Sequence, residues 1–285
     1  MVREPTDEGY VDREGVRLHW LEWAPSGTTE SPAILLLHGL SSNARYWERV
    51  ARRMTNRRLV ALDQRSHGLS DAPPTGYGLE LLAADAGHVI RELGLNRPVI
   101  VGHSWGGTVA LEVGARLGEL VSAVALMDGP IASISESITW EDASRMMQPP
   151  LPRYRSLDDA YQASRQVLGD AWDDDLQPFV RAGLWPDGDT WVLRLTATVR
   201  LQILEQLYQF RPDVAAAAIT APLLIGLAAN DAALRARKEA GARRIKEIRP
   251  DADIRWYDSQ HDIPLIRADD VARDLEELAQ RSVSI

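Results

Sequence analysis

Cysteine is absent from the 285-residue sequence. Its absence excludes disulfide bonds, thiolate metal sites and a cysteine nucleophile. The sequence also has no apolar run near the roughly 20 residues that span a bilayer. Its first ten residues are acidic and polar, without the basic and apolar regions of a signal peptide. We therefore expect a cytoplasmic protein.

Positive charge is in the minority, with 32 Lys and Arg against 41 Asp and Glu and a net charge of −9. An acidic surface repels phosphate backbones and anionic lipid headgroups. We therefore expect no nucleic-acid or membrane partner. A small-molecule ligand and a monomer or homodimer are further expectations that do not rest on the charge. Phenylalanine is scarce, at two residues, whereas tryptophan occurs nine times. Its rigid apolar ring suits either a core or the lining of a pocket.

Short apolar runs alternate with helical patterns along most of the chain. Residues 16–23 alternate apolar and polar side chains, as a half-buried strand does. The later runs are continuously apolar, as in strands buried on both faces of a parallel sheet, and cover 33–37, 59–62, 99–101, 123–127, 223–227 and 254–257. Helical patterns separate them at 46–54, 79–93, 106–117, 234–248 and 269–281. This alternation predicts an α/β fold with a mostly parallel, doubly wound sheet.

The segment 130–212 interrupts the alternation. It carries helical patterns at 142–147, 157–168 and 191–210, separated by prolines, which end helices. We interpret it as a helical cap inserted into a core made of residues 1–129 and 213–285. Its large side chains either dock the cap on the core or line a binding pocket. The candidates for the pocket are Trp140, Met146, Trp185 and Tyr208.

Ser104 is the candidate nucleophile, in the segment Gly102-His103-Ser104-Trp105-Gly106. A Gly-x-Ser-x-Gly pattern between a buried strand and a helix predicts a strained turn that lifts the serine hydroxyl clear of the sheet. The two glycines let strand and helix cross closely. The helix also points its first amides at the serine, where negative charge develops during acyl transfer.

A serine hydroxyl needs a base, and His261 is the candidate. Of the six histidines, it is the one that follows the last predicted strand. Loops at the carboxyl ends of parallel strands meet at one edge of the sheet, so His261 and Ser104 should converge. We expect His38 and His67 to brace backbone, and the side chain of His103 to point away from the serine hydroxyl.

The histidine needs a carboxylate to fix its tautomer. Asp231, in the loop after the predicted strand 223–227, is the first choice, and Asp128, which ends the strand 123–127, is the alternative. The order Ser, Asp, His along the chain is the order expected for this type of site. No metal-ligand cluster and no Gly-rich phosphate loop is present in the sequence, so we expect neither metal nor cofactor.

The oxyanion formed during acyl transfer needs two backbone donors. The amide of Trp105, directly after the nucleophile, is one candidate. The other is the amide of Leu40, in the loop after the predicted strand 33–37, where Gly39 lets the backbone turn inward. Ser41 could add a hydroxyl to substrate binding, although a helix cap is its alternative role.

These residues together resemble the α/β-hydrolase superfamily, in particular its esterase-like branch with a helical cap. The resemblance rests on the stretches 37–40, 63–70 and 102–106, on Asn230-Asp231 and on the loop around His261. It covers nearly the whole chain and implies the α/β-hydrolase fold. Ser66 departs from the family pattern, which has glycine there. Epoxide hydrolases and haloalkane dehalogenases share the pattern around Ser104 but use aspartate as nucleophile, so the resemblance does not extend to their chemistry.

The sequence therefore predicts a serine hydrolase that cleaves carboxylic esters, lactones included, of small to medium apolar substrates. Two alternatives remain open. One is a carbon–carbon bond hydrolase acting on ring-fission products, which shares the triad. The other is a non-enzymatic ligand receptor, because one fold hosts many functions.

Overall fold

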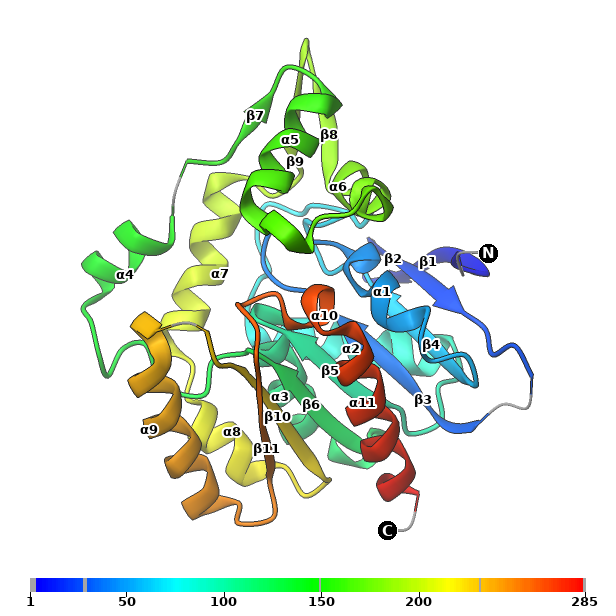
Figure 1. The fold of residues 1–285 in the computed structure, drawn as a ribbon, viewed down its shortest axis with the longest axis vertical. Coiled ribbons are helices and arrows are strands. Elements are labelled where there is room, and N and C mark those ends of the chain that lie inside the picture. The colour runs from blue at the N-terminus through cyan, green and yellow to red at the C-terminus, as the bar shows by residue number, and fades with distance from the viewer. Residues whose placement is uncertain (1–3, 28–29, 149, 231, 284–285) are drawn as a thin grey trace.

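The computed structural model describes residues 4–27, 30–148, 150–230 and 232–283. Their centre is an eight-stranded sheet in the order β1-β2-β4-β3-β5-β6-β10-β11 (Figure 1). The strands are β1 (Asp7–Arg13), β2 (Val16–Trp23), β3 (Glu30–Leu37), β4 (Arg57–Leu62), β5 (Val99–His103), β6 (Ala123–Met127), β10 (Leu223–Ala228) and β11 (Asp253–Tyr257). β2 pairs antiparallel with β1 and β4, and the strands from β4 to β11 pair in parallel.

Helices cover both faces of this sheet. One hydrophobic cluster joins α2 (Leu79–Glu92), α3 (Trp105–Arg116) and α8 (Pro212–Ala218) to one face. A second joins α1 (Glu48–Ala51), α10 (Ile263–Ile266) and α11 (Ala268–Ser282) to the other. α9 (Ala232–Ile248) lies between β10 and β11 in the chain, and short 3-10 helices occur at Ala44–Trp47, Gly118–Leu120, Gly169–Ala171 and Asp174–Leu176. The sheet is therefore doubly wound, as expected.

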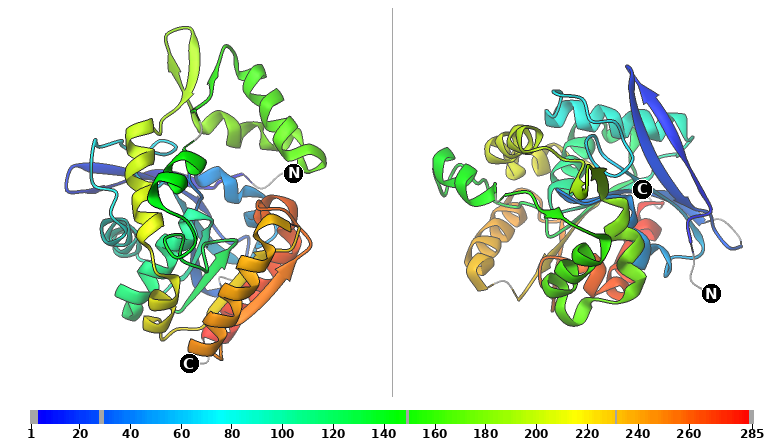
Figure 2. Two further views of the ribbon diagram at one scale, coloured as in Figure 1. Left: turned by 90° about the vertical axis from the view of Figure 1, so that its left-hand side faces the viewer. Right: turned by 90° about the horizontal axis from the view of Figure 1, so that it is seen from above.

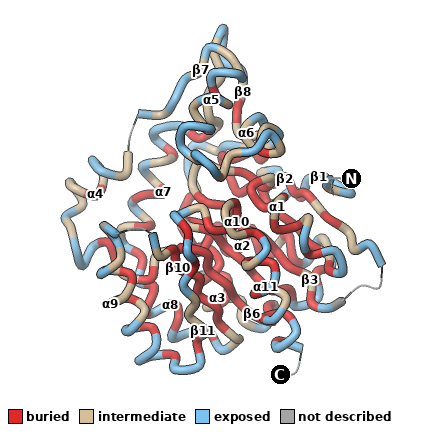
Figure 3. Tube along the Cα trace, viewed as in Figure 1, coloured by how far each residue is buried: buried red, intermediate tan, exposed pale blue. Residues whose placement is uncertain are grey.

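Burial explains why the central strands read as continuous apolar runs. Every residue of β5 and β6 is buried, because helices pack on both sides of these strands. Figure 3 shows the buried residues concentrated in the sheet and its flanking helices, with the segment above the sheet more exposed. No helix in the described ranges has the length and apolar character needed to cross a membrane.

The segment between β6 and β10 contains strands as well as helices. Its elements are α4 (Trp140–Met147), β7 (Arg153–Tyr154), α5 (Leu157–Leu168), α6 (Gln177–Ala182), β8 (Leu184–Asp187), β9 (Thr190–Leu193) and α7 (Ala197–Gln209). The three strands form a small antiparallel sheet in the order β7-β9-β8. The expectation of a helix over 191–210 is therefore wrong for its first residues. Gly188, at φ 58°, turns β8 into β9, and Thr190-Trp191-Val192 are β-favouring residues.

This segment stands at one end of the sheet (Figures 1 and 2). Polar contacts tie it to the core. Asp175 accepts from Arg49 at 2.7 Å and from Arg52 at 2.6 Å, and the Asn43 amide donates to the carbonyl of Phe179 at 2.9 Å. These contacts hold the segment on the core; its role as a cap, with limits at 130 and 212, stays a prediction.

Candidate active site

Three candidate side chains follow three different strands of the large sheet. Ser104 comes directly after β5, Asp128 directly after β6, and His261 shortly after β11. These strands run parallel, so their carboxyl ends lie at the same edge. The topology thereby brings together residues that are far apart in the sequence, as expected for Ser104 and His261.

Ser104 lies in a strained turn between β5 and α3. Its backbone has φ 53° and ψ −121°, a left-handed conformation that side-chain-bearing residues rarely adopt. A Cβ on Gly102 would lie 2.0 Å from the Gly106 carbonyl oxygen, and one on Gly106 would lie 2.3 Å from that of Leu37. Both positions therefore require glycine, and the turn holds Ser104 partly exposed at the edge of the sheet.

The ring of His261 hydrogen-bonds the carboxylate of Asp128. Nδ1 lies 2.8 Å from Oδ2. An ionised carboxylate only accepts hydrogen bonds, so Nδ1 carries the proton and Nε2 is left as the proton acceptor. The Asp128 side chain is 2% exposed and the His261 side chain 51%, so a buried carboxylate orients an accessible imidazole ring.

Asp128 accepts from two further donors. The Ala228 amide donates to Oδ1 at 2.9 Å, and Lys238 Nζ lies 2.9 Å from Oδ1 and 3.0 Å from Oδ2. Burial raises the pKa of the Asp128 carboxyl. The hydrogen bonds from His261, Ala228 and Lys238 outweigh burial and hold that pKa below its usual value. Asp128 is therefore ionised at neutral pH.

The contact between His261 and Asp128 also determines the pKa of His261. Burial lowers it, but the hydrogen bond and the charge of Asp128, with a contribution from Asp262, raise it above the ordinary value of 6.5. Lys238 acts in the opposite direction and lowers the pKa of His261. Asp231, the first choice from the sequence for this carboxylate, lies outside the described residues. The structure places the alternative, Asp128, at the ring.

The two candidate oxyanion donors belong to residues near Ser104: Trp105 follows it in the chain, and Leu40 lines the same cavity. The Trp105 amide is the first N–H of α3, and the first four amides of a helix have no acceptor within it. In the loop after β3, the Ser41 amide donates to His67 Nε2 at 3.1 Å and the Ser42 amide to the Gly39 carbonyl at 3.2 Å. Within the described part of the chain, the Leu40 amide has no such acceptor and remains available to a ligand.

His38 and His67 hold this loop in place, as expected. His38 Nε2 accepts from the Gln64 amide at 3.1 Å, and its Nδ1 lies 2.8 Å from the Gly39 carbonyl. His67 Nδ1 likewise lies 2.8 Å from the Arg65 carbonyl. Burial, with the charge of His38, lowers the pKa of His67 to about 3, so this ring stays neutral and can accept from Ser41.

His103 contributes in a way that the sequence did not reveal. Its Nε2 lies 3.0 Å from the His261 carbonyl oxygen, and its ring stacks on Tyr46 with 4.6 Å between the centroids. Tyr46 in turn donates to Asp262 at 3.1 Å. Burial lowers the pKa of His103 to about 4. A neutral His103 therefore anchors the backbone of the loop that carries the base.

A cavity of about 370 Å³ opens beside Ser104. The core lines it with Leu40, Ser41, Ser104 and His261, among others, and the cap lines it with Tyr154, Phe179 and one side of α5. The α5 residues at the cavity are Ala163, Ser164, Val167 and Leu168. This size falls at the lower end of the range of small-molecule sites.

None of the four predicted cap residues lines this cavity. Trp140 packs edge-on against Tyr208, with the ring centroids 5.3 Å apart, and Met146 is 72% exposed. Trp185 donates to the Gly68 carbonyl at 3.0 Å and lies under the guanidinium of Arg194. Ser41 alone of the predicted binding residues reaches the cavity, and its hydroxyl accepts from Arg200 at 2.8 Å. Composition identified large cap side chains but not the direction in which they point.

Among the residues that the structure describes, no group of three or more His, Asp or Glu is arranged to hold a metal ion.

Comparison with known proteins identifies the family of this chain. The model of the alpha/beta hydrolase family matches residues 34–274. Epoxide hydrolase 3 from Xenopus tropicalis is 38% identical over 127 residues, which are 43% of this chain and 34% of that protein. 2-(Acetamidomethylene)succinate hydrolase from Mesorhizobium japonicum is 38% identical over 98 residues, 34% of this chain and 35% of that protein. The similarity thus spans about a third of the length of these relatives.

Solved structures resemble the fold over nearly its whole length. A crystal structure of E-2-(acetamidomethylene)succinate hydrolase superimposes with a TM-score of 0.80 at 21% identity, covering 95% of this chain and 98% of that one. The enol-lactonase from Burkholderia xenovorans superimposes with a TM-score of 0.71 at 19% identity, covering 95% and 99%.

Proposed function

Because the chain belongs to the alpha/beta hydrolase family, we propose that it is a serine hydrolase that cleaves carboxylic esters, lactones included, of small to medium apolar substrates. One observation carries the proposal. Ser104 and His261 line one cavity, His261 is hydrogen-bonded to the buried Asp128, and Leu40 of the two candidate oxyanion residues lines the same cavity. Several relatives are named epoxide hydrolases. The serine supports ester chemistry here, because the epoxide hydrolases that share this turn use an aspartate.

The reaction proceeds in two halves. The Ser104 hydroxyl attacks the ester carbonyl while His261 Nε2 takes its proton, and Asp128 stabilises the ring in its charged form. The amides of Leu40 and Trp105 bind the developing oxyanion. His261 returns the proton to the leaving alcohol, which leaves an acyl group on Ser104. Water then attacks this acyl group, with His261 again as base, and releases the acid.

The cavity supports the substrate class. Its cap side is mainly apolar, from Ala163, Val167, Leu168 and Phe179, and its volume suits a small to medium acyl or alkyl group. The hydroxyl groups of Ser41, Ser42, Tyr154 and Ser164 also line the cavity and could orient the polar part of an ester.

The decisive experiment is a panel of esters, lactones, amides and a ring-fission dienoate, assayed with the wild type and Ser104→Ala. We expect ester or lactone turnover, and a loss of about 1,000-fold or more in Ser104→Ala. Ser144→Ala is the matched control and should keep the wild-type rate, because Ser144 lies on α4 and its hydroxyl donates to the backbone carbonyl of Glu141.

An organophosphonate should label Ser104 stoichiometrically. Full ester hydrolysis by Ser104→Ala would contradict the proposal. So would labelling without turnover of any ester or lactone, which would favour a ligand receptor, and so would turnover of the dienoate alone, which would favour a carbon–carbon hydrolase.

A further inference from the structure

Lys238 is an unusual residue in this chain. Of the 32 basic residues only Lys238 and Lys246 are lysines, and both lie on α9. Lys238 is only 9% exposed, whereas Lys246 is exposed and donates to the Pro250 carbonyl. Burying an ammonium group costs free energy unless it is paired and hydrogen-bonded, and lysine is rarely buried otherwise. The position of Lys238 therefore calls for a physical reason.

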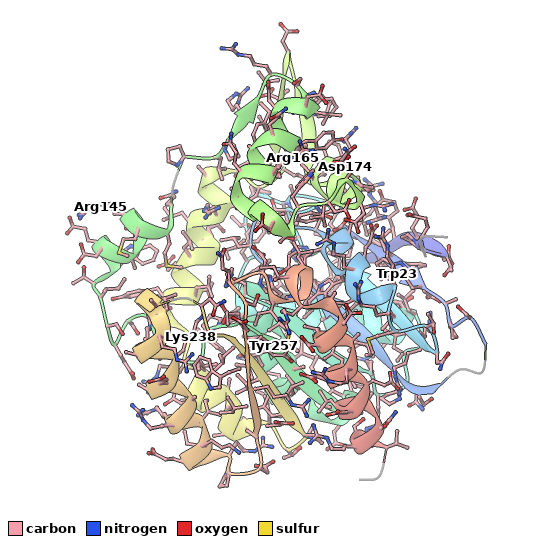
Figure 4. The ribbon with its side chains drawn as sticks, in the orientation of Figure 1. Trp23, Arg145, Arg165, Asp174, Lys238 and Tyr257 are labelled. Atoms are coloured by element: carbon pink, nitrogen blue, oxygen red, sulfur yellow. The ribbon has the colours of Figure 1, made fainter. Side chains whose placement is uncertain are left out.

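The burial of Lys238 is explained by its contact with Asp128. Lys238 extends from α9 beside the sheet (Figure 4), and its Nζ contacts both oxygens of Asp128, at 2.9 and 3.0 Å. Nζ also donates to the Ala228 carbonyl at 3.2 Å, and the Ala228 amide donates to Asp128. Lysine presents one compact charge, which fits between a carboxylate and a carbonyl better than a planar guanidinium would.

We propose that Lys238 is a positioning residue for the hydrolytic reaction. Its ammonium group holds the Asp128 carboxylate against His261 and partly neutralises the negative charge that this carboxylate presents to the ring. This inference rests on the proposed serine-hydrolase function. It adds a fourth residue, a cation behind the acid, to the Ser-His-Asp arrangement.

The electrostatics around His261 explain the effect. Asp128 faces the ring from the end of β6, Asp262 adjoins it in the same loop, Lys238 faces the pair from α9, and His103 lies beside it at the end of β5. The two aspartates raise the pKa of His261, and Lys238 lowers it. Without the cation, the full charge of Asp128 would act on the ring. More of His261 would then be protonated near neutral pH and unable to accept the serine proton.

The test removes the charge but keeps a hydrogen-bond donor, with Lys238→Gln. We expect its rate–pH profile to move to higher pH, so that kcat/KM at pH 6 falls about threefold or more relative to its value at pH 9. Lys238→Arg, which restores a cation, should recover the wild-type position at least in part. Lys246→Gln removes the same charge from the exposed end of α9 and should leave the profile unchanged.

A second measurement needs no activity. The His261 ring signal, assigned from its absence in His261→Ala, is titrated by NMR in the wild type and Lys238→Gln, with Lys238→Met as a second charge-free variant should Lys238→Gln fail to fold. We expect a higher pKa in the charge-free variants. An unchanged ring titration, or a loss of kcat/KM by the same factor at every pH, would overturn the inference. If no ester is hydrolysed, the proposed function fails, while the ring titration still decides the role of Lys238.

Discussion

The residues of the candidate site differ in burial according to what each must do. Asp128 is almost fully buried, accepts several hydrogen bonds and is held ionised. His261 is half exposed, so its Nε2 can meet both Ser104 and a substrate. A buried acid keeps its partner in one tautomer, whereas an accessible base can exchange protons with ligand and water. The difference in burial between Asp128 and His261 therefore guides what substitutions at the site should do.

Asp128→Asn should leave the fold intact and reduce kcat by roughly 1,000- to 10,000-fold, because an amide no longer fixes the His261 tautomer or stabilises the charged ring. Steady-state kinetics with the best ester substrate measure this loss. Asp231→Asn is the comparison variant and should lose far less. A reversed order of the two losses would make Asp231 the orienting carboxylate instead.

The pH dependence follows from the raised pKa of His261. The neutral ring is the active form, so kcat/KM should rise with pH through this pKa and reach a plateau above it. The acidic limb should therefore lie above pH 6.5, the ordinary value for histidine. Rates measured from pH 5 to 9 test this. An acidic limb below pH 6.5 would mean that burial has a larger effect than Asp128 on the pKa of His261.

Sequence reasoning found some of these residues and not others for physical reasons. Ser104 follows from a local steric pattern, and His261 follows from strand order. Asp128 and Asp231 both follow strands that end at the same edge, and only side-chain direction distinguishes such residues. The sequence pattern does not distinguish Lys238 from other charged residues, because a charged residue within a polar helix is typical of a solvated face.

At the scale of elements, the turn between β5 and α3 leaves no room for added side-chain atoms at its glycines. Gly102→Ala would place a Cβ 2.0 Å from a backbone oxygen of the helix, so strand and helix would have to separate. We expect destabilisation of roughly 3 kcal/mol or more in chemical unfolding, or failure to fold. Gly27→Ala, whose Cβ would meet nothing within 4 Å, is the control and should unfold like the wild type.

Helix α5 of the cap should control substrate size. Ala163→Phe adds a ring on the face that lines the cavity, so it should raise KM for longer acyl chains about tenfold and leave acetyl esters nearly unchanged. Gln162→Phe, at an exposed position of the same helix that does not line the cavity, is the matched control. Equal effects of the two variants on all chain lengths would exclude α5 as part of the binding wall.

The strands of the core were easier to predict than those of the cap. β2 and β6 have the predicted limits, because one alternates cleanly and the other is apolar throughout. β7, β8 and β9 have two to four residues each and are partly exposed. Such strands show neither alternation nor a buried run, and their pairing depends on contacts within the cap.

At the scale of the whole molecule, the residues of the site follow strands that differ in burial and in their place in the sheet. β5, which leads to Ser104, lies between β3 and β6 in the middle of the sheet and is fully buried. β11, which leads to His261, lies at the edge of the sheet that the described residues form, next to β10, and most of its residues are at least partly exposed. Local stability falls with fewer buried contacts, so the base is held less firmly than the nucleophile.

Mild denaturant should therefore abolish activity before it unfolds the protein. In urea, ester hydrolysis should be lost reversibly at a lower concentration than far-ultraviolet circular dichroism, as β11 separates from β10 ahead of the central strands. Activity and dichroism followed on the same samples provide the test. Superimposable transitions would show that β11 unfolds together with the rest of the sheet.

The same position of β11 has a consequence during synthesis. Domains fold as the chain emerges, and residues that pair late in the chain are added last. The nucleophilic turn is complete once the chain reaches about residue 107, but its base arrives more than 150 residues later. The growing polypeptide therefore carries Ser104 without His261 while more than 150 residues are added. Under the proposed function, hydrolytic chemistry therefore begins only when β11 has joined the sheet and brought His261 to Ser104.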